Sequence, residues 1–245
     1  RKGMLVLEDA SHAPLSEYSN KKGIKFKVGA CKHSDITIMS MHAIKHIAMG
    51  EGGVILTNNK LYASEARKLR SHGIIRDSKK WTGIAALKNA PWYYEMQEIG
   101  WNYRATEMQC ALGKSQLALI HKSLQKRNII ANKYSKLLNN IDSVLLPVKP
   151  SNNENHSYHL YPISIDFNLI KKTRTDIMNK LKSRGIGTQV HYIPLFYQPY
   201  YSDKYTKYPG AVRYYNSTLS IPMYLGLNTQ DIKYISNTII DIIHA

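Results

Sequence analysis

The alternation of strand-like and helical segments is the feature that most limits the folds open to this chain. Apolar runs are expected to form short strands at residues 4–10, 35–40 and 53–58. Helical spacing follows over residues 61–73, ending at a glycine, and over residues 103–141 with possible breaks. Strands that are followed by helices in this way indicate an α/β domain.

The second half of the chain has its own pattern. Two prolines and the polar run at residues 151–155 are expected to mark a boundary. Beyond it the sequence predicts strands and helices in the order strand 157–167, helix 173–187, strand 188–195 and helix 228–245.

Two local signals support the helices of this second half. Thr173 and Asp176 have the spacing of a capping box, and an isoleucine stripe lies on one face of the last helix. We therefore predict that residues 1–150 are part of a large domain with a long connecting helix, and that residues 151–245 form a smaller α+β domain.

Composition limits the class of protein. The formal net charge is +17, but the basic residues are spread over expected helix faces and do not alternate with aromatic residues in a block, which argues against a nucleic-acid groove. No run approaches the roughly 18 apolar residues of a membrane span. The 2 cysteines form no disulfide or zinc pattern, so we expect a reducing, cytoplasmic setting.

Polar groups gather where the expected strands end. Asp9 and His12 lie at the end of the first strand, and Lys45 lies beyond the end of the second. Ligands of α/β sheets bind beyond the carboxyl ends of strands, so an acid and a lysine could face one ligand there. A partly desolvated lysine is a nucleophile toward carbonyls, and pyridoxal 5'-phosphate (PLP) requires such a lysine, an acid for its ring nitrogen and donors for its phosphate. Ser40 is a candidate phosphate donor.

Plainer interpretations remain open at this point. A strand-end aspartate often only forms a turn, and a single lysine is often a solvated side chain. His42 and His46 are four residues apart and could suggest a metal pair. The glycines that follow disfavour a helix there, and Ala43 stands where a metalloprotease motif has glutamate, so we expect no metal site.

Longer motifs carry a resemblance to a known family. The stretches EDASHA, SDITIMSMHAIKHIAMGEGGVILTN, LRSHGI, WYYEMQEIGWNYRATEMQCALGKSQL and GIGTQVHYIPL together resemble the DegT/StrS-type sugar-nucleotide aminotransferases, which are fold-type I PLP enzymes. Within this family, the lysine turn with GEGG and the stretches PWYYE and GTQVHYIPL resemble the members of pseudaminic-acid biosynthesis. These aminate carbon 4 of a UDP-4-keto-6-deoxy-N-acetylhexosamine, with L-glutamate as the amino donor.

The resemblance implies a role for each cofactor residue. Lys45 would form the Schiff base with PLP and carry the proton between the cofactor and the sugar carbon. Asp9 would pair with the pyridine nitrogen, His12 would contact the phenolic oxygen, and Ser40 would bind the phosphate. Asn102 would reach the phosphate of the neighbouring subunit's cofactor, so the resemblance implies a homodimer with shared active sites.

The resemblance also assigns substrate contacts and implies a missing part. His42 and His191 would lie near the substrate sugar or its diphosphate, and we expect His46 only to pack. Lys45 itself favours a transaminase, because related sugar dehydratases carry histidine at that position. Family members have a further third of chain before the first strand. We therefore expect the 245 residues to be the C-terminal part of a fold-type I enzyme, with the rest of a large mixed-sheet domain plus a small α+β domain, and to be a poor catalyst alone.

Other hypotheses are an aminotransferase for a different keto-sugar nucleotide, a non-catalytic regulator that kept the fold, and a basic nucleic-acid binder. A lysine-bound cofactor would separate the aminotransferases from the other two classes. The sequence does not determine the sugar epimer or the product.

Overall fold

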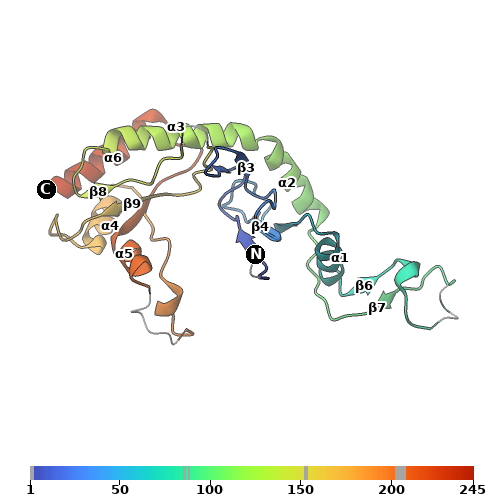
Figure 1. The fold of residues 1–245 in the computed structure, drawn as a ribbon. Coiled ribbons are helices and arrows are strands. Elements are labelled where there is room, and N and C mark those ends of the chain that lie inside the picture. The colour runs from blue at the N-terminus through green and yellow to red at the C-terminus, as the bar shows by residue number, and fades with distance from the viewer. Residues whose placement is uncertain (1–2, 85–86, 88, 152–153, 202–207) are drawn as a thin grey trace. The chain divides into compact units, whose positions relative to one another are not determined.

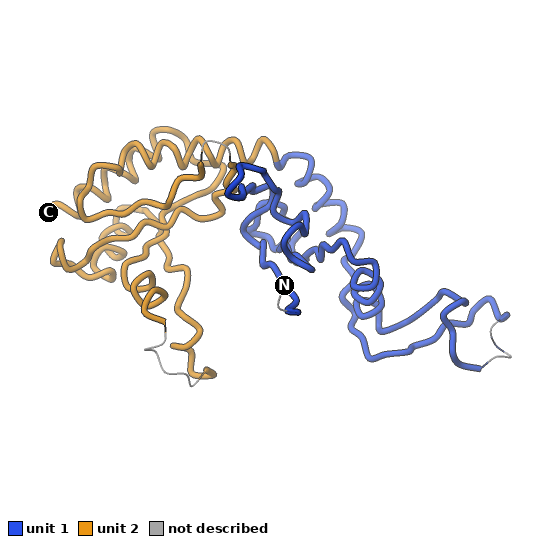
Figure 2. Tube along the Cα trace, in the orientation of Figure 1, with its two compact units in different colours: residues 1–120 blue, residues 121–245 orange. Residues whose placement is uncertain are grey.

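The computed structural model describes residues 3–84, 87, 89–151, 154–201 and 208–245. The chain divides into two compact units, residues 1–120 (unit 1) and residues 121–245 (unit 2), which Figure 2 colours separately. The division falls at the start of a long helix that our domain prediction placed entirely in the first domain. Residues 152 and 153 of the predicted boundary lie outside the described residues, so the domain limits stay a prediction.

Unit 1 is built on a three-stranded mixed sheet in the order β1-β4-β5. Its strands are β1 (Leu7–Asp9), β4 (Ile36–Ser40) and β5 (Gly53–Leu56), which confirms the three expected strands. β1 runs parallel to β4, and β5 runs antiparallel to it. Because β1 and β4 are parallel, their carboxyl ends meet at one edge of the sheet.

The two faces of this sheet differ. Asp9 pairs with Ile38, and Ile38 with Ile55, so these residues share one face, where Ile55 is 55% exposed. The opposite face carries Met39 and Leu56, and Gly29 packs so closely against both that an added Cβ would lie 2.5 Å from Met39. The segment between β1 and β4 therefore covers one face and leaves the face of Asp9 open.

The other elements of unit 1 are short, apart from two helices. A hairpin joins β2 (Glu17–Ser19) to β3 (Lys25–Lys27), and a second antiparallel pair joins β6 (Ile74–Ile75) to β7 (Glu95–Met96), with the 3-10 helix η1 (Ser78–Lys80) after β6. Neither strand pair was predicted. The helices are α1 (Lys60–Leu69) and α2 (Glu107–Ala118).

Each of these helices begins at a residue that caps it. Asn59 accepts the backbone amides of Leu61 and Tyr62 at the start of α1, and Thr106 forms a capping box with Gln109 at the start of α2. α2 ends at Ala118 and α3 (Ile120–Leu138) begins two residues later, so the predicted long helical region contains one break.

Unit 2 packs helices on an antiparallel sheet (Figure 1). The sheet has the order β10-β9-β8, with β8 (Val144–Leu145), β9 (Tyr161–Ile165) and β10 (Thr218–Ile221). Its helices after α3 are α4 (Arg174–Ser183), α5 (Pro209–Ser217) and α6 (Thr229–His244). The predicted capping box of α4 and the isoleucine stripe of α6 are both confirmed.

One predicted strand is wrong. Residues 188–195 form no strand: Gln189 makes a single bridge with Ser220 of β10, and the chain then continues irregularly into the 3-10 helix η3 (Leu195–Tyr197). In the antiparallel register set by Gln189 and Ser220, residues beyond His191 would lie opposite α5 and not β10, so the ladder has no strand along which to extend. The strand that fills the sheet edge is β10, which the sequence pattern did not indicate.

Candidate active site

The candidate site lies at the carboxyl ends of β1 and β4. Asp9 is the last residue of β1, and Ser40 is the last residue of β4. The register places Asp9 beside Ile38, so Asp9 and Ser40 lie on the same face of the sheet, two residues apart along β4. Asp9 and Ser40 therefore lie at the same edge of the sheet.

Lys45 stands in the connection between β4 and β5. The Lys45 amide donates to the His42 carbonyl at 2.9 Å, which makes a turn, and residues 43–47 contain no helix. The loop is closed at its base by the Met49 amide bonding to the Met41 carbonyl, and by the Met41 amide bonding to the Gly52 carbonyl. These bonds fix the short loop that presents Lys45 beyond the sheet edge.

Glycine is required at two positions of this loop. Gly50 has φ +85°, a left-handed conformation that side chains rarely adopt. At Gly52 an added Cβ would meet the Met49 sulfur at 2.6 Å. The conformation of Gly50 and the close packing of Gly52 on Met49 thus account for two glycines of the run Gly50-Glu51-Gly52-Gly53.

The charges of Lys45 and Asp9 influence each other. Burial lowers the pKa of the half-buried Lys45 amine, and the Asp9 carboxylate partly opposes this change. The pKa of Asp9 is lowered by hydrogen bonds from the Ser11 hydroxyl at 2.5 Å and the Ser11 amide at 3.0 Å; burial acts against them, and the charges of His12 and Lys45 lower it further. Burial thus shifts Lys45 toward the neutral amine, which is the nucleophilic form, and the charge of Asp9 acts on it from the same edge of the sheet.

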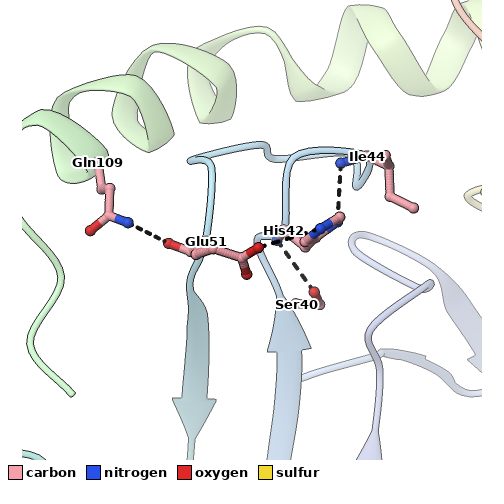
Figure 3. Close-up of polar contacts among 5 residues, drawn as sticks. All are labelled: Ser40, His42, Ile44, Glu51 and Gln109. Atoms are coloured by element: carbon pink, nitrogen blue, oxygen red, sulfur yellow. Dashed lines mark hydrogen bonds and ion pairs between the residues drawn. The ribbon is translucent and has the colours of Figure 1, made fainter.

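Figure 3 shows how His42 is held. Its Nδ1 accepts the Ile44 amide at 3.4 Å, so the neutral ring carries its proton on Nε2, which lies 3.5 Å from the Glu51 carboxylate. The His42 amide donates to the Ser40 hydroxyl at 3.3 Å, and Gln109 of α2 donates to the Glu51 carbonyl at 3.0 Å. Ser40 and His42 are therefore joined in one network above the strand ends.

The other predicted site residues lie elsewhere or have other surroundings. The charge of His12 acts on Asp9, so these two residues are near each other. Asn102 is exposed and bridges to Ser71, and no hydrogen bond or ion pair among the described residues joins it to Asp9 or Lys45. His191 belongs to unit 2, where its Nδ1 lies 2.9 Å from the Ser220 hydroxyl.

Two contributors to the site were missed from the sequence. Ser11 supplies both hydrogen bonds to Asp9, and the spacing Asp-Ala-Ser is a signal for such a turn. Glu51 was noted only as part of a glycine run. His46 is buried, in keeping with the packing role expected for it.

Two further searches covered the described part of the chain. No group of three or more His, Cys, Asp or Glu side chains there is arranged to hold a metal ion. Within the same residues, every helix is too short or too polar to cross a lipid bilayer.

Comparisons with known proteins assign the family. Residues 1–240 match the model of the DegT/DnrJ/EryC1/StrS aminotransferase family. The uncharacterized protein MJ1066 of Methanocaldococcus jannaschii is 33% identical over 240 residues, which cover 96% of this chain and 59% of MJ1066. The UDP-4-amino-4,6-dideoxy-N-acetyl-beta-L-altrosamine transaminase of Campylobacter jejuni is 34% identical over 97% of this chain and 58% of its own length.

Solved structures agree with this assignment. Helicobacter pylori PseC, an aminotransferase of pseudaminic acid biosynthesis, has a TM-score of 0.81 and 30% identity, covering 97% of this chain and 59% of PseC. DesV from S. venezuelae, at 24% identity and a TM-score of 0.82, shares the fold over 100% of this chain and 59% of DesV. The chain thus spans about 59% of the length of the proteins it matches. It belongs to the DegT/DnrJ/EryC1/StrS aminotransferase family.

Proposed function

We propose that the protein is a sugar-nucleotide aminotransferase that uses PLP, with Lys45 as its catalytic lysine. The observation that carries the proposal is that Asp9 ends β1 and Lys45 lies in the loop that follows the neighbouring parallel strand β4, so both belong to the same edge of the sheet. The pKa of Lys45 is lowered by burial, and the carboxylate of Asp9 is stabilised by Ser11. A partly desolvated amine and a carboxylate at one edge of the sheet are two of the groups that PLP requires.

The residues present fit the cofactor. PLP, when bound, supplies a protonated pyridine ring that withdraws electrons from the carbon atom joined to nitrogen. The Asp9 carboxylate would hold the proton on the ring nitrogen, and Ser40 would donate its hydroxyl to the phosphate. The Lys45 Nζ would bond to the aldehyde carbon with loss of water and, when the amine of the donor displaces it, would carry a proton between the cofactor carbon and the substrate carbon.

The substrate class follows from the relatives. We propose that the amino group is transferred to carbon 4 of a UDP-4-keto-6-deoxy-N-acetylhexosamine from L-glutamate. Support comes from relatives named as altrosamine transaminases in C. jejuni and H. pylori, at 34% and 32% identity. His42 and His191 would lie near the sugar or its diphosphate. A different keto-sugar nucleotide is the alternative, and activity on it alone would exclude the first choice.

The partner and the compartment are also proposals. Asn102 is exposed and away from the hydrogen bonds of the site of its own chain, which is compatible with service to the cofactor of a second subunit in a homodimer. We place the enzyme in the cytoplasm. Mixed dimers of Lys45→Ala and Asn102→Ala subunits have one intact site if Asn102 acts across the interface, and should recover up to about half of the activity. No recovery would reject the shared site.

The experiment for the main proposal is covalent capture. The full-length protein is incubated with PLP, reduced with borohydride, digested and mapped by mass spectrometry. We expect the cofactor on the peptide that contains Lys45, with a visible absorbance band before reduction. Lys60, an exposed lysine at the start of α1, is the matched internal control and should remain unlabelled at stoichiometric PLP.

The capture has a clear negative outcome. Label distributed over surface lysines such as Lys60, with none enriched at Lys45, would reject the proposed cofactor site. In Lys45→Arg the absorbance band should be absent, because a guanidinium does not form the imine.

A further inference from the structure

The side of the sheet on which Asp9 stands depends on very few contacts. β1 has only three residues paired with β4, and Asp9 is the last of them. In a strand, neighbouring side chains point to opposite faces, so a slip of one residue would turn Asp9 toward the covered face. Something must hold this short strand in register for Asp9 to remain on the open face.

A polar network crosses from β1 to β4 on the covered face. The Thr37 hydroxyl donates to the Glu8 carboxylate at 2.6 Å, and these two residues are register partners. The Ser34 hydroxyl lies 3.0 Å from the Thr37 hydroxyl and donates to the same Glu8 oxygen at 3.4 Å. The Cys31 thiol lies 3.4 Å from Thr37 and donates to the Leu56 carbonyl of β5. The network thus links all three strands.

The network is shielded from water. Thr37 is 0% exposed and Ser34 is 8% exposed, and Glu8 is half-buried between exposed neighbours in β1. Tyr18 lies near Glu8: burial raises the pKa of Tyr18, and the negative charge of Glu8 raises it further. A hydrogen bond to a charged group in such surroundings is stronger than one between neutral groups, so loss of the Thr37 donor leaves a poorly solvated carboxylate.

We propose that Glu8 and Thr37 are positioning residues that lock the register of β1 on β4 and thereby keep Asp9 on the open face beside Lys45. Neither residue touches the reacting groups. The side chain of Glu8 is anchored on the covered face of the sheet. The side chain of the next residue, Asp9, therefore points to the open face. The consequence for catalysis rests on the proposed role of Asp9; the register lock itself does not.

Amide hydrogen exchange tests the lock without cofactor. The Ala10 amide donates to the Ile38 carbonyl at 2.8 Å, and it reports on the end of β1. In Thr37→Val, which keeps the shape and removes the hydroxyl, exchange of the Ala10 amide should accelerate by roughly tenfold or more. The Met41 amide, bonded to Gly52 across β4 and β5, should change by less than about threefold.

Matched variants separate positioning from packing. Thr57→Val removes a hydroxyl that donates to the Asp35 carbonyl at 2.7 Å in the same unit, and it should leave the Ala10 amide unchanged. Thr37→Ser keeps the hydroxyl and loses the methyl group, and it should restore slow exchange. Glu8→Gln keeps an acceptor but loses the charge, and a smaller acceleration is expected; it also serves if Thr37→Val does not fold.

A titration with PLP connects the lock to the site. The apparent Kd for PLP should rise roughly tenfold in Thr37→Val and stay within about twofold in Thr57→Val. Unchanged Ala10 exchange in both Thr37→Val and Glu8→Gln would overturn the lock, and so would equal acceleration at Met41. Faster Ala10 exchange with unaltered PLP affinity would overturn the link to Asp9. If the wild-type protein binds no PLP, the proposed function fails while the exchange data still decide the register.

Discussion

Unit 1 and unit 2 are held together in different ways. One contiguous cluster of buried apolar side chains, spread over residues 130–243, forms the core of unit 2 and draws on α3, α4, α6, β9 and β10. Unit 1 has few buried apolar side chains, and its sheet exposes Leu7 at 63% and Ile55 at 55%. Its conformation depends on polar contacts: Ser11 with Asp9, Thr37 with Glu8, and a group of donors around Glu95.

This difference separates stability from chemistry. Burial of apolar surface is the main favourable term in folding, so unit 2 has the means to be stable by itself. Polar networks contribute less net stability, but they fix the orientation of side chains. Lys45 and Asp9 require a fixed orientation to act on one ligand. We expect substitutions in unit 2 to affect unfolding and substitutions in unit 1 to affect the site. The predictions below test that division.

The largest effect is expected for Lys45→Ala. Removal of the amine should abolish covalent cofactor binding and reduce turnover by several orders of magnitude, because no other group replaces the nucleophile. Lys45 is only half-buried, so the free energy of unfolding should change by less than about 0.5 kcal/mol. Absorbance and turnover measure the effect on the site, and denaturant unfolding measures the effect on stability. Large destabilisation, or normal turnover, would contradict the expectation that substitutions in unit 1 affect the site and not the stability.

The second prediction compares two leucines. Leu181 of α4 is 0% exposed in the core of unit 2, and Leu181→Ala should lower the free energy of unfolding by about 2–5 kcal/mol. Leu7 of β1 is 63% exposed, and Leu7→Ala should cost about 0.5 kcal/mol or less. Denaturant titrations followed by circular dichroism provide both values. Equal losses would mean that unit 1 has a core comparable to that of unit 2.

The third prediction concerns charge at the site. Asp9→Asn keeps the size of the side chain but removes the charge that would face the cofactor ring. Transamination should slow by roughly a hundredfold, since loss of one such electrostatic partner costs about 3 kcal/mol at the transition state. Steady-state kinetics give the effect, and the lysine-bound absorbance should persist. A loss below about tenfold would assign the role to another group.

The sequence predicted the elements whose patterns are local. Each feature that was recognised depends on residues that are adjacent or periodic in the sequence. These features are the apolar runs of β1, β4 and β5, the capping box at Thr173 and the isoleucine stripe of α6. The gathering of Asp9 and Lys45 followed from strand ends and from family resemblance, and the mutual influence of their charges agrees with it.

Elements that depend on distant partners were missed or wrong. β10 is buried at every position and reads as Thr-Leu-Ser-Ile, a run too short to indicate a strand until β9 is beside it. Residues 188–195 have the composition of a strand, but among them only Gln189 forms a backbone bridge to a strand. The Glu8–Thr37 hydrogen bond joins residues 29 positions apart, and no local sequence pattern indicates it. Contacts between residues distant in sequence therefore determine which of these segments form strands, and local sequence propensity does not.

The segment around Glu95 offers the smallest and most local test. Glu95 is buried in unit 1 and accepts hydrogen bonds from the amides of Thr82 and Gly83, each at 2.8 Å, from the Tyr93 hydroxyl at 3.1 Å and from the Gln97 side chain at 2.7 Å. Burial alone would raise its pKa, but these hydrogen bonds lower the pKa to about 2.

The direction of the pH effect follows from that value. The carboxylate is more acidic in the folded segment than its ordinary value of 4.5, so its contribution is complete above about pH 4.5 and is lost as the pH falls toward 2. The 3 tryptophans of the chain, Trp81, Trp92 and Trp101, all lie in or beside this segment, so tryptophan fluorescence, excited selectively, reports on it. The helices of unit 2 dominate far-ultraviolet circular dichroism, which reports on the other unit.

An acid titration can therefore compare the two units in one sample. Between pH 4.5 and 2 the fluorescence of the wild-type protein should change before the helical signal does, since unit 2 depends on apolar burial and not on this carboxylate. In Glu95→Gln the fluorescence at pH 7 should already be close to that of the acidified wild type, and this step should be missing from the titration. Glu107→Gln, at the start of α2, should keep it. If fluorescence and circular dichroism change together in the wild type, the two units do not respond independently to acid.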